Sequence, residues 1–430
     1  MLIHPPSGSS RVMGMSSVGI GAPTRPGFGK DATQARHAWP LPGVAGRQVA
    51  KQADTHGMRI PDFKLERYFA RWEFAAPYLL CSSDIEGWRM ADLLALAGPD
   101  ERARWEGLTL GYTESTGLPA LREEIAALYP GLSPEQVLTF AGAEEALFVL
   151  VNVLLGPGDH AVVTWPGYQS LHEVARATGA DVTLLRLREE DGWALDLDAL
   201  RRALTPRTRL LLVNFPHNPT GALLDRAAFD ALCELSRERG IHLLSDEVYR
   251  LLEYDTRDTL PPAASHTPHG ISLGVMSKAF GLAGLRVGWL ACRDVELLRR
   301  CAAYKDYTTI CNSAPSEVLS LIALRAKARV LARSRELLAA NLSLLDGFFA
   351  RHPDTFQWVR PRAGSVAFPR LLRETPVARF TEELREREGV LLLPGDVYDF
   401  PGNHFRLGLG RTNLPDALER LERYVVDTSR

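Results

Sequence analysis

The strongest constraint on the fold is a regular alternation of two sequence patterns between residues 137 and 295. Short apolar runs are separated by stretches with apolar residues at helical spacing, such as DRAAFDALCELSRERG. The apolar runs are HAVVTW, ADVTLLRL, RLLLVNF, IHLLSDE, ISLGVMS and VGWLAC. Strands that alternate with helices predict an α/β fold whose sheet is largely parallel and covered by helices on both faces.

The sequence on either side of this region has a different pattern of apolar residues. FKLERYFARWEFAA and LPALREEIAALY each predict an amphipathic helix, and short strands are expected near GSVAFPR, GVLLLPG and HFRLGLG. We predict a large domain over residues 106–315 and a smaller α+β domain made of residues 58–105 and 316–430. Residues 1–57, rich in Gly, Ser and Pro, predict a flexible tail, with an interaction arm or a biological start at Met58 as alternatives.

Composition removes several classes of function. The 50 basic and 52 acidic residues leave a net charge of −2, so nothing favours a nucleic-acid or acidic-membrane partner. There is no apolar run of about 18 residues, and MLIHPPSGSS lacks a signal-peptide core. Five widely spaced cysteines fit neither a disulfide framework nor a metal site. We therefore expect a cytoplasmic protein with reduced thiols.

Lysine is scarce, which limits any chemistry that needs an amine. The lysines are Lys30, Lys51, Lys64, Lys278, Lys305 and Lys327. Only Lys278 directly follows an apolar strand pattern, and burial there would lower the pKa of its amine and make it a nucleophile. By its position alone, a catalytic role and a surface role for Lys278 remain equally open.

Other polar residues also follow predicted strands, at the sheet edge where open α/β folds bind ligands. The motifs are NFPHNPTG, SDEVY and SKAFGLAGLRVGW. Together they resemble the class I/II aminotransferases, which are fold-type I pyridoxal-phosphate (PLP) enzymes, over roughly residues 60–430. The resemblance implies a mostly parallel seven-stranded sheet, bound PLP and a homodimer with a shared active site. GLAGLRVG is not a GxGxxG fingerprint, so a nicotinamide site is disfavoured.

The resemblance also implies roles for individual residues. Lys278 would form a Schiff base with PLP and later move a proton at the substrate α-carbon. Asp246 would pair with the pyridine nitrogen, while Tyr249 and Asn218 would hydrogen-bond the phenolic oxygen. By the residues alone, these three could equally be a helix-entry acid, a buried tyrosine and a turn asparagine.

A phosphate site is expected at the start of the helix in TFAGAEEALFVL, because helix N-termini present free N–H groups. Its donors would be Gly142, Ala143, Glu144, Ser277 and Arg286. Val275 stands where the family often has a further serine, so one phosphate contact is missing or comes from elsewhere.

Aromatic residues are expected at two further places. Tyr168 would stack on the pyridine ring, with Trp165 as the nearby competitor. In the segment GYTESTGLPALREEIA, Tyr112 would reach the phosphate in the neighbouring subunit.

The substrate would meet three residues, namely Arg406, Asn218 and Ser83. The guanidinium of Arg406 would grip the α-carboxylate, with Arg411 as runner-up. The loop LLCSSDIEGW resembles the capreomycidine-synthase-like branch, in which arginine-derived substrates react. Asp84 and Glu86 in this loop, or Asp306, could recognise a cationic side chain, or could simply cap and solvate their segments.

The expected reaction is amino-group transfer between an L-amino acid and a 2-keto acid through Lys278. The alternative is a PLP-dependent lyase, cyclase or oxidase that acts on an arginine-like amino acid. A PLP-binding regulator is disfavoured, because residues 1–57 show no helical period and no basic recognition helix.

Overall fold

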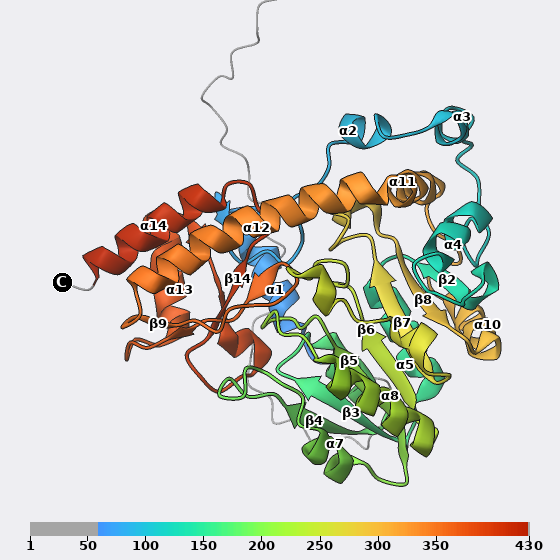
Figure 1. The fold of residues 1–430 in the computed structure, drawn as a ribbon, viewed down its shortest axis with the longest axis horizontal. Coiled ribbons are helices and arrows are strands. Elements are labelled where there is room, and N and C mark those ends of the chain that lie inside the picture. Colours follow the sequence, from blue (N-terminus) through green and yellow to red (C-terminus); the bar gives the residue numbers. More distant parts are fainter. Residues whose placement is uncertain (1–58, 429–430) are drawn as a thin grey trace, which may run out of the picture. The chain divides into compact units, whose positions relative to one another are not determined.

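The computed structural model describes residues 59–428, so the predicted tail and the alternative start at Met58 lie outside the described residues. Its central feature is a seven-stranded sheet (Figure 1). The strands, in sheet order, are β2 (Val137–Phe140), β8 (Gly288–Cys292), β7 (Gly270–Val275), β6 (His242–Asp246), β5 (Thr208–Asn214), β3 (His160–Trp165) and β4 (Asp181–Arg186). Only β8 runs antiparallel to its neighbours, β7 and β2. The predicted sheet is confirmed, and each of the six apolar runs contains one strand.

Helices cover both faces of this sheet, which explains why the strand sequences are almost continuously apolar. Leu211 and Leu212 of β5 point to opposite faces, and each enters a different buried cluster. Leu211 belongs to the same buried cluster as Leu232 of α8, whereas Leu212 belongs to the same buried cluster as Leu150 of α5. The helices of this region are α5 (Ala143–Leu154), α6 (Ser170–Ala177), α7 (Leu197–Ala203), α8 (Arg226–Arg239), α9 (Ala263–His266) and α10 (Val295–Lys305).

Local signals set the helix ends. The Asp225 carboxylate accepts a hydrogen bond from the Ala228 N–H at 2.7 Å, which begins α8, and Gly240 ends it in the left-handed conformation with φ of +61°. The predicted helix in DRAAFDALCELSRERG is therefore confirmed at Arg226–Arg239.

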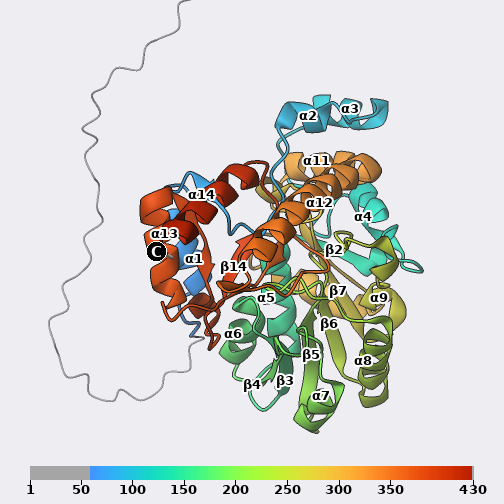
Figure 2. The ribbon, with the colours of Figure 1, turned by 60° about the vertical axis from the view of Figure 1, so that its left-hand side comes forward.

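Segments from both ends of the described chain pack together. Tyr78 of β1 (Tyr78–Leu79) pairs in parallel with Val390 of β12 (Val390–Leu391). The helix α1 (Lys64–Trp72) lies beside α13 (Val377–Glu388) in Figure 2, and Cζ of Arg385 in α13 lies 3.7 Å from the centroid of the Trp72 ring. The last helix is α14 (Leu414–Asp427). The Tyr68 hydroxyl donates to the Leu392 carbonyl at 2.7 Å. These contacts suit a smaller unit built from both termini, although its predicted boundaries stay a prediction.

The remaining elements of the described residues are helices, short 3₁₀ turns and short strands. The helices are α2 (Met90–Leu94), α3 (Pro99–Glu106), α4 (Pro119–Ala126), α11 (Ala314–Arg325) and α12 (Lys327–Arg351), and the short 3₁₀ turns are Pro134–Gln136, Thr256–Asp258, Ala283–Leu285 and Gly395–Tyr398. The strands are β9 (Phe356–Gln357), β10 (Val366–Ala367), β11 (Arg370–Leu371), β13 (Leu393–Pro394) and β14 (Phe405–Gly408). The strands β10, β12, β13 and β14 confirm the short strands predicted near GSVAFPR, GVLLLPG and HFRLGLG, whereas β9 was not predicted. Within residues 59–428, no helix is both long enough and apolar enough to cross a membrane.

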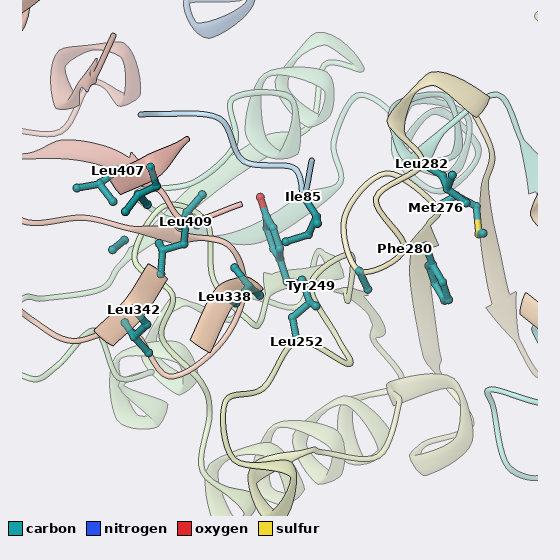
Figure 3. Close-up of a cluster of buried hydrophobic side chains, with 14 of the residues drawn as sticks. Ile85, Tyr249, Leu252, Met276, Phe280, Leu282, Leu338, Leu342, Leu407 and Leu409 are labelled. Atoms are coloured by element: carbon teal, nitrogen blue, oxygen red, sulfur yellow. The ribbon is translucent and has the colours of Figure 1, made fainter. Parts of the chain in front are cut away.

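An apolar cluster supports the residues that follow β6. Figure 3 shows the ring of Tyr249 among Ile85, Leu252 and Leu338, the last of which comes from α12. The ring is 1% exposed, so its orientation is set by packing from distant parts of the chain. The edge of the sheet at β6 and β7 is therefore a rigid base for a site.

Candidate active site

One cavity of about 330 Å³ lies at the carboxyl ends of β5, β6 and β7. It is lined by Leu65, Glu66, Phe69, Glu73, Ser82, Ser83, Asp84, Ala143, Glu144, Leu147, Tyr168, Leu171, Asn214, Asn218, Asp246, Val248, Tyr249, Leu273, Val275, Ser277, Lys278, Ala283 and Arg286. Eleven of the residues proposed for the site from the sequence, Asp84 included, are among them, whereas Gly142, Arg406 and Tyr112 are not. Parallel strands explain this convergence, since their carboxyl ends meet at one edge of the sheet.

Asp246 ends β6 as a buried carboxylate without an ion-pair partner among the described residues. Its side chain accepts the Val248 N–H at 3.2 Å, and its carbonyl accepts the side-chain amide of Asn214 at 3.0 Å. Burial raises the pKa of Asp246 to about 7, and the nearby Lys278 amine opposes that rise. A positively charged ligand atom beside Asp246 would therefore be strongly favoured.

Lys278 follows β7 and donates from Nζ to the hydroxyl of Ser83 at 2.8 Å. Burial lowers the pKa of Lys278 to about 8, and the guanidinium of Arg406 lowers it further, while Asp84, Asp246 and other acids oppose the shift. A larger fraction of this amine is neutral near pH 8 than for an ordinary lysine, so it can act as a nucleophile and as a base. The structure thus brings Lys278 and Ser83 together, although they are 195 residues apart.

The predicted phosphate donors form a close-packed corner. Gly142, which precedes α5, has φ of +96°, and a Cβ there would lie only 2.6 Å from Nη2 of Arg286. A Cβ on Gly288 would lie 2.6 Å from the Ala143 nitrogen, so both glycines permit the close approach of backbone and guanidinium. A helix N-terminus beside an arginine is suited to bind an anion. Val275 is buried in the cavity wall, so it supplies no hydroxyl there.

Arg406, on β14, is 1% exposed, and only some of its side-chain N–H groups have hydrogen-bond partners. Its Nε donates to the Cys81 carbonyl at 3.0 Å and its Nη1 to the Tyr398 hydroxyl at 2.9 Å and the Asn218 side chain at 3.4 Å. Its Nη2 is buried with no hydrogen-bond partner among the described residues. An unpaired guanidinium N–H is costly, by roughly 1–3 kcal/mol, and therefore indicates an anionic ligand.

The runner-up Arg411 is engaged elsewhere, since it forms an ion pair with Asp84 at 2.9 Å. Glu86 likewise accepts the Thr412 N–H at 2.6 Å. Asp306 lies at the C-terminal cap of α10 and does not line the cavity. Of the acids proposed from the sequence to recognise a cation, only Asp84 lines the cavity, and it already has a cationic partner.

Among the aromatic candidates, the cavity contains Tyr168 but not Trp165. The Tyr168 hydroxyl donates to Glu66 at 2.9 Å, whereas Trp165 donates from its indole nitrogen to the Tyr398 carbonyl at 3.2 Å. Tyr112 is 90% exposed and is not part of this cavity. The structure therefore favours Tyr168 for stacking.

Sequence reasoning gave no role to Asn214 and missed two acids of the α1 segment, Glu66 and Glu73. Asn214 belongs to the motif NFPHNPTG at the end of a predicted strand. Its side-chain oxygen accepts the Asn218 N–H at 2.8 Å, so it shapes the turn that follows β5. The spacing of Glu66, Phe69 and Glu73 places them on one helix face, but no sequence pattern says that this face borders the cavity.

Comparisons with known proteins agree with this geometry. The family model for aminotransferase class I and II matches residues 90–421. Capreomycidine synthase from Streptomyces vinaceus is 33% identical over 363 residues, which cover 84% of this chain and 92% of the relative. Arginine–pyruvate transaminase from Pseudomonas aeruginosa is 32% identical over 335 residues, which cover 72% of this chain and 81% of the relative.

Solved structures are also similar. A PLP-dependent aminotransferase from Streptococcus suis superposes with a TM-score of 0.81 at 32% identity, covering 86% of this chain and 99% of the other. The PLP-dependent cyclase OrfR superposes with a TM-score of 0.79 at 30% identity, covering 87% of this chain and 100% of the other. The chain belongs to the class I and II aminotransferase family, whose fold-type I enzymes use PLP.

Proposed function

We propose that the protein is an aminotransferase that moves an amino group between an L-amino acid and a 2-keto acid. The observation that carries the proposal is the pairing, in one cavity, of an amine of lowered pKa (Lys278) with a buried carboxylate that lacks a cationic partner (Asp246). PLP, when bound, supplies an aldehyde for the substrate amine and a ring that accepts electrons from the α-carbon.

The residues present fit this cofactor. Asp246 would hold the proton of the pyridine nitrogen, which would give its buried charge the partner it lacks. Arg286 and the N-terminus of α5 would bind the phosphate, and the glycine at position 142 leaves the space that this approach needs. Tyr249 and Asn218 would hydrogen-bond the phenolic oxygen, and Tyr168 would stack on the ring.

The reaction then depends on where protons and substrate are held. Arg406 would bind the α-carboxylate through its unpartnered Nη2, and this contact would fix the α-carbon in the cavity. Lys278 would take the proton from the substrate α-carbon and deliver it to the cofactor carbon that is joined to the substrate nitrogen. It can act as this base because its neutral form is accessible near pH 8. The Ser83 hydroxyl, which accepts from Lys278 at 2.8 Å, would orient the amine.

We further propose a homodimer in which Tyr112 completes the neighbouring active site. Leu110, Tyr112 and Tyr307 are 87%, 90% and 91% exposed, and Thr113 bonds to the Asn312 carbonyl, which joins their two segments. Exposed aromatic and aliphatic groups of this kind favour burial against a second copy. Sedimentation should give a dimer; a monomer with full activity would contradict this assembly.

A second candidate is a lyase or cyclase that acts on an arginine-like amino acid. Similarity to the PLP-dependent cyclase OrfR supports the reaction, and similarity to arginine–pyruvate transaminase supports the substrate. The same lysine and aspartate would serve either reaction, because the proton moved at the α-carbon is common to both.

A screen of amino-acid donors, with the products identified by mass spectrometry, distinguishes amino-group transfer from the lyase or cyclase reaction. Purified holoenzyme would be incubated with single L-amino acids and either pyruvate or 2-oxoglutarate. Amino-group transfer predicts a new keto acid together with alanine or glutamate. A product that retains its amino group, formed without any acceptor, would overturn transfer and favour the second candidate.

A further inference from the structure

Part of the cavity wall is formed by α1 and its C-terminal cap. Glu66, Phe69 and Glu73 line the cavity at spacings of three and four residues, so they share one face of the helix. The Phe69 ring centroid lies 5.6 Å from Cζ of Arg406. A substrate whose α-carboxylate is held by Arg406 would therefore lie close to this face of α1.

The acidic side chains that α1 and its C-terminal cap contribute to the cavity have no cationic partner among the residues that the structure describes. Asp84 pairs with Arg411, Asp246 would face the pyridine nitrogen, and Glu144 accepts a hydrogen bond from Ser170. Neither Glu66 nor Glu73 forms an ion pair with a cation within residues 59–428. Glu66 accepts only the Tyr168 hydroxyl, and the Glu73 carboxylate has no hydrogen bond in that part of the chain.

These two acids also repel one another and Asp84. Burial raises the pKa of Glu73, and the charges of Asp84 and Glu66 raise it further, against a smaller opposing effect of Arg411. A cation placed among them would remove this repulsion and gain two charge-assisted hydrogen-bond partners.

A second observation points to a ligand in the same cavity. Ser82 is 3% exposed and lines the cavity, and its hydroxyl has no hydrogen-bond partner among the described residues. It can accept an N–H from a ligand. Across residues 59–428, no three His, Cys, Asp or Glu side chains are arranged to hold a metal ion, so these oxygens are better matched to an organic cation.

We propose that Glu66 and Glu73 bind the positively charged side chain of the amino-acid substrate, with Ser82 as a further acceptor. The substrate class is an L-amino acid that carries a guanidinium or ammonium group, and this assignment rests on the function proposed above. A planar guanidinium suits the site best, because it presents five N–H donors to several acceptors at once.

The test compares two ligands of nearly the same shape, L-arginine and its uncharged counterpart L-citrulline. Each is titrated into the holoenzyme without a keto-acid acceptor, and the dependence of the early change in cofactor absorbance on its concentration gives its apparent Kd. The wild type should bind arginine at least about tenfold more tightly than citrulline, as expected for charge-assisted hydrogen bonds. L-Ornithine, titrated in the same way, shows whether an ammonium group is also accepted.

The variants Glu66→Gln and Glu73→Gln keep the shape of each side chain and remove its charge. Each should lower the affinity for arginine by about tenfold, leave that for citrulline nearly unchanged, and retain the cofactor spectrum. Glu106→Gln is the matched control, since Glu106 is an exposed residue of α3 outside the cavity. It should keep the wild-type ratio of the two affinities.

Equal affinities for arginine and citrulline in the wild type would overturn this proposal, as would a ratio that neither variant changes. If neutral or acidic amino acids perturb the spectrum and arginine does not, the charge recognition is wrong but the proposed function stands. If the cofactor is bound and no amino acid perturbs its spectrum, the proposed function itself fails.

Discussion

Two lysines of this chain, one partly buried and one fully buried, have very different surroundings. Lys278 lies at the end of β7 and lines the cavity, and its amine donates one hydrogen bond, to the Ser83 hydroxyl at 2.8 Å. Lys305 lies at the end of α10, is 0% exposed, and donates to the Ser115 carbonyl at 2.7 Å and to the Asn312 side chain at 3.1 Å. Burial lowers the pKa of both amines.

The difference teaches that burial and a shifted pKa do not by themselves make a lysine reactive. Lys305 is surrounded by protein acceptors, and Asn312 carries the network on to the Phe140 carbonyl at 2.7 Å, just before α5. This amine ties the segment around Ser115 to the sheet. Lys278 has open volume beside it, so its amine can reach a ligand.

The largest expected difference between the two lysines is in the rate of turnover after each is replaced. Lys278→Ala should lower the rate of amino-group transfer by about 10³-fold, because it removes both the nucleophile and the base that moves the α-proton. Steady-state kinetics with the donor found in the screen would measure it. Circular dichroism should show wild-type folding; turnover within tenfold of the wild type would break the comparison.

The next effect is a pH dependence of cofactor capture by the apoprotein. Only the neutral amine attacks the aldehyde, and the pKa of Lys278 is about 8. The rate of covalent attachment should therefore rise about tenfold per pH unit below pH 8 and level off above it. Stopped-flow absorbance between pH 6 and 10 would follow this rate.

A rise that continues to pH 10 would show an ordinary lysine and contradict the lowered pKa. Asp246→Asn is the control, because the pKa of Asp246 is about 7 and could produce a break of its own. A single break should persist in that variant and move to somewhat lower pH, because the charge of Asp246 raises the pKa of Lys278.

The smallest effect concerns Lys305. Lys305→Met keeps much of the side-chain volume but leaves the Ser115 carbonyl and the Asn312 side chain without this donor. It should lower the free energy of unfolding by about 1–3 kcal/mol, measured in urea, while transfer at low temperature stays within about threefold of the wild type. Lys64→Met, which breaks an exposed ion pair with Asp399, should cost under about 1 kcal/mol. Loss of activity without loss of stability in Lys305→Met would break the comparison.

Sequence reasoning located the site residues at the strand ends and at the start of α5, but not the cavity-lining residues of α1. Asp246 and Lys278 could be predicted because apolar runs locate strands, and parallel strands end at one edge. Glu66 and Glu73 could not, since the face that α1 turns to the cavity is fixed by tertiary contacts such as the bond from Tyr68 to the Leu392 carbonyl. The burial of Lys305 was equally hidden, because helical spacing does not reveal which loop will cover a residue.

The most direct test is to reduce the holoenzyme with borohydride and map the modified peptides by mass spectrometry. The account predicts one phosphopyridoxyl group, on the peptide that contains Lys278, and none on the peptide that contains Lys305. Attachment to any other lysine, or a label that survives in Lys278→Ala, would contradict it.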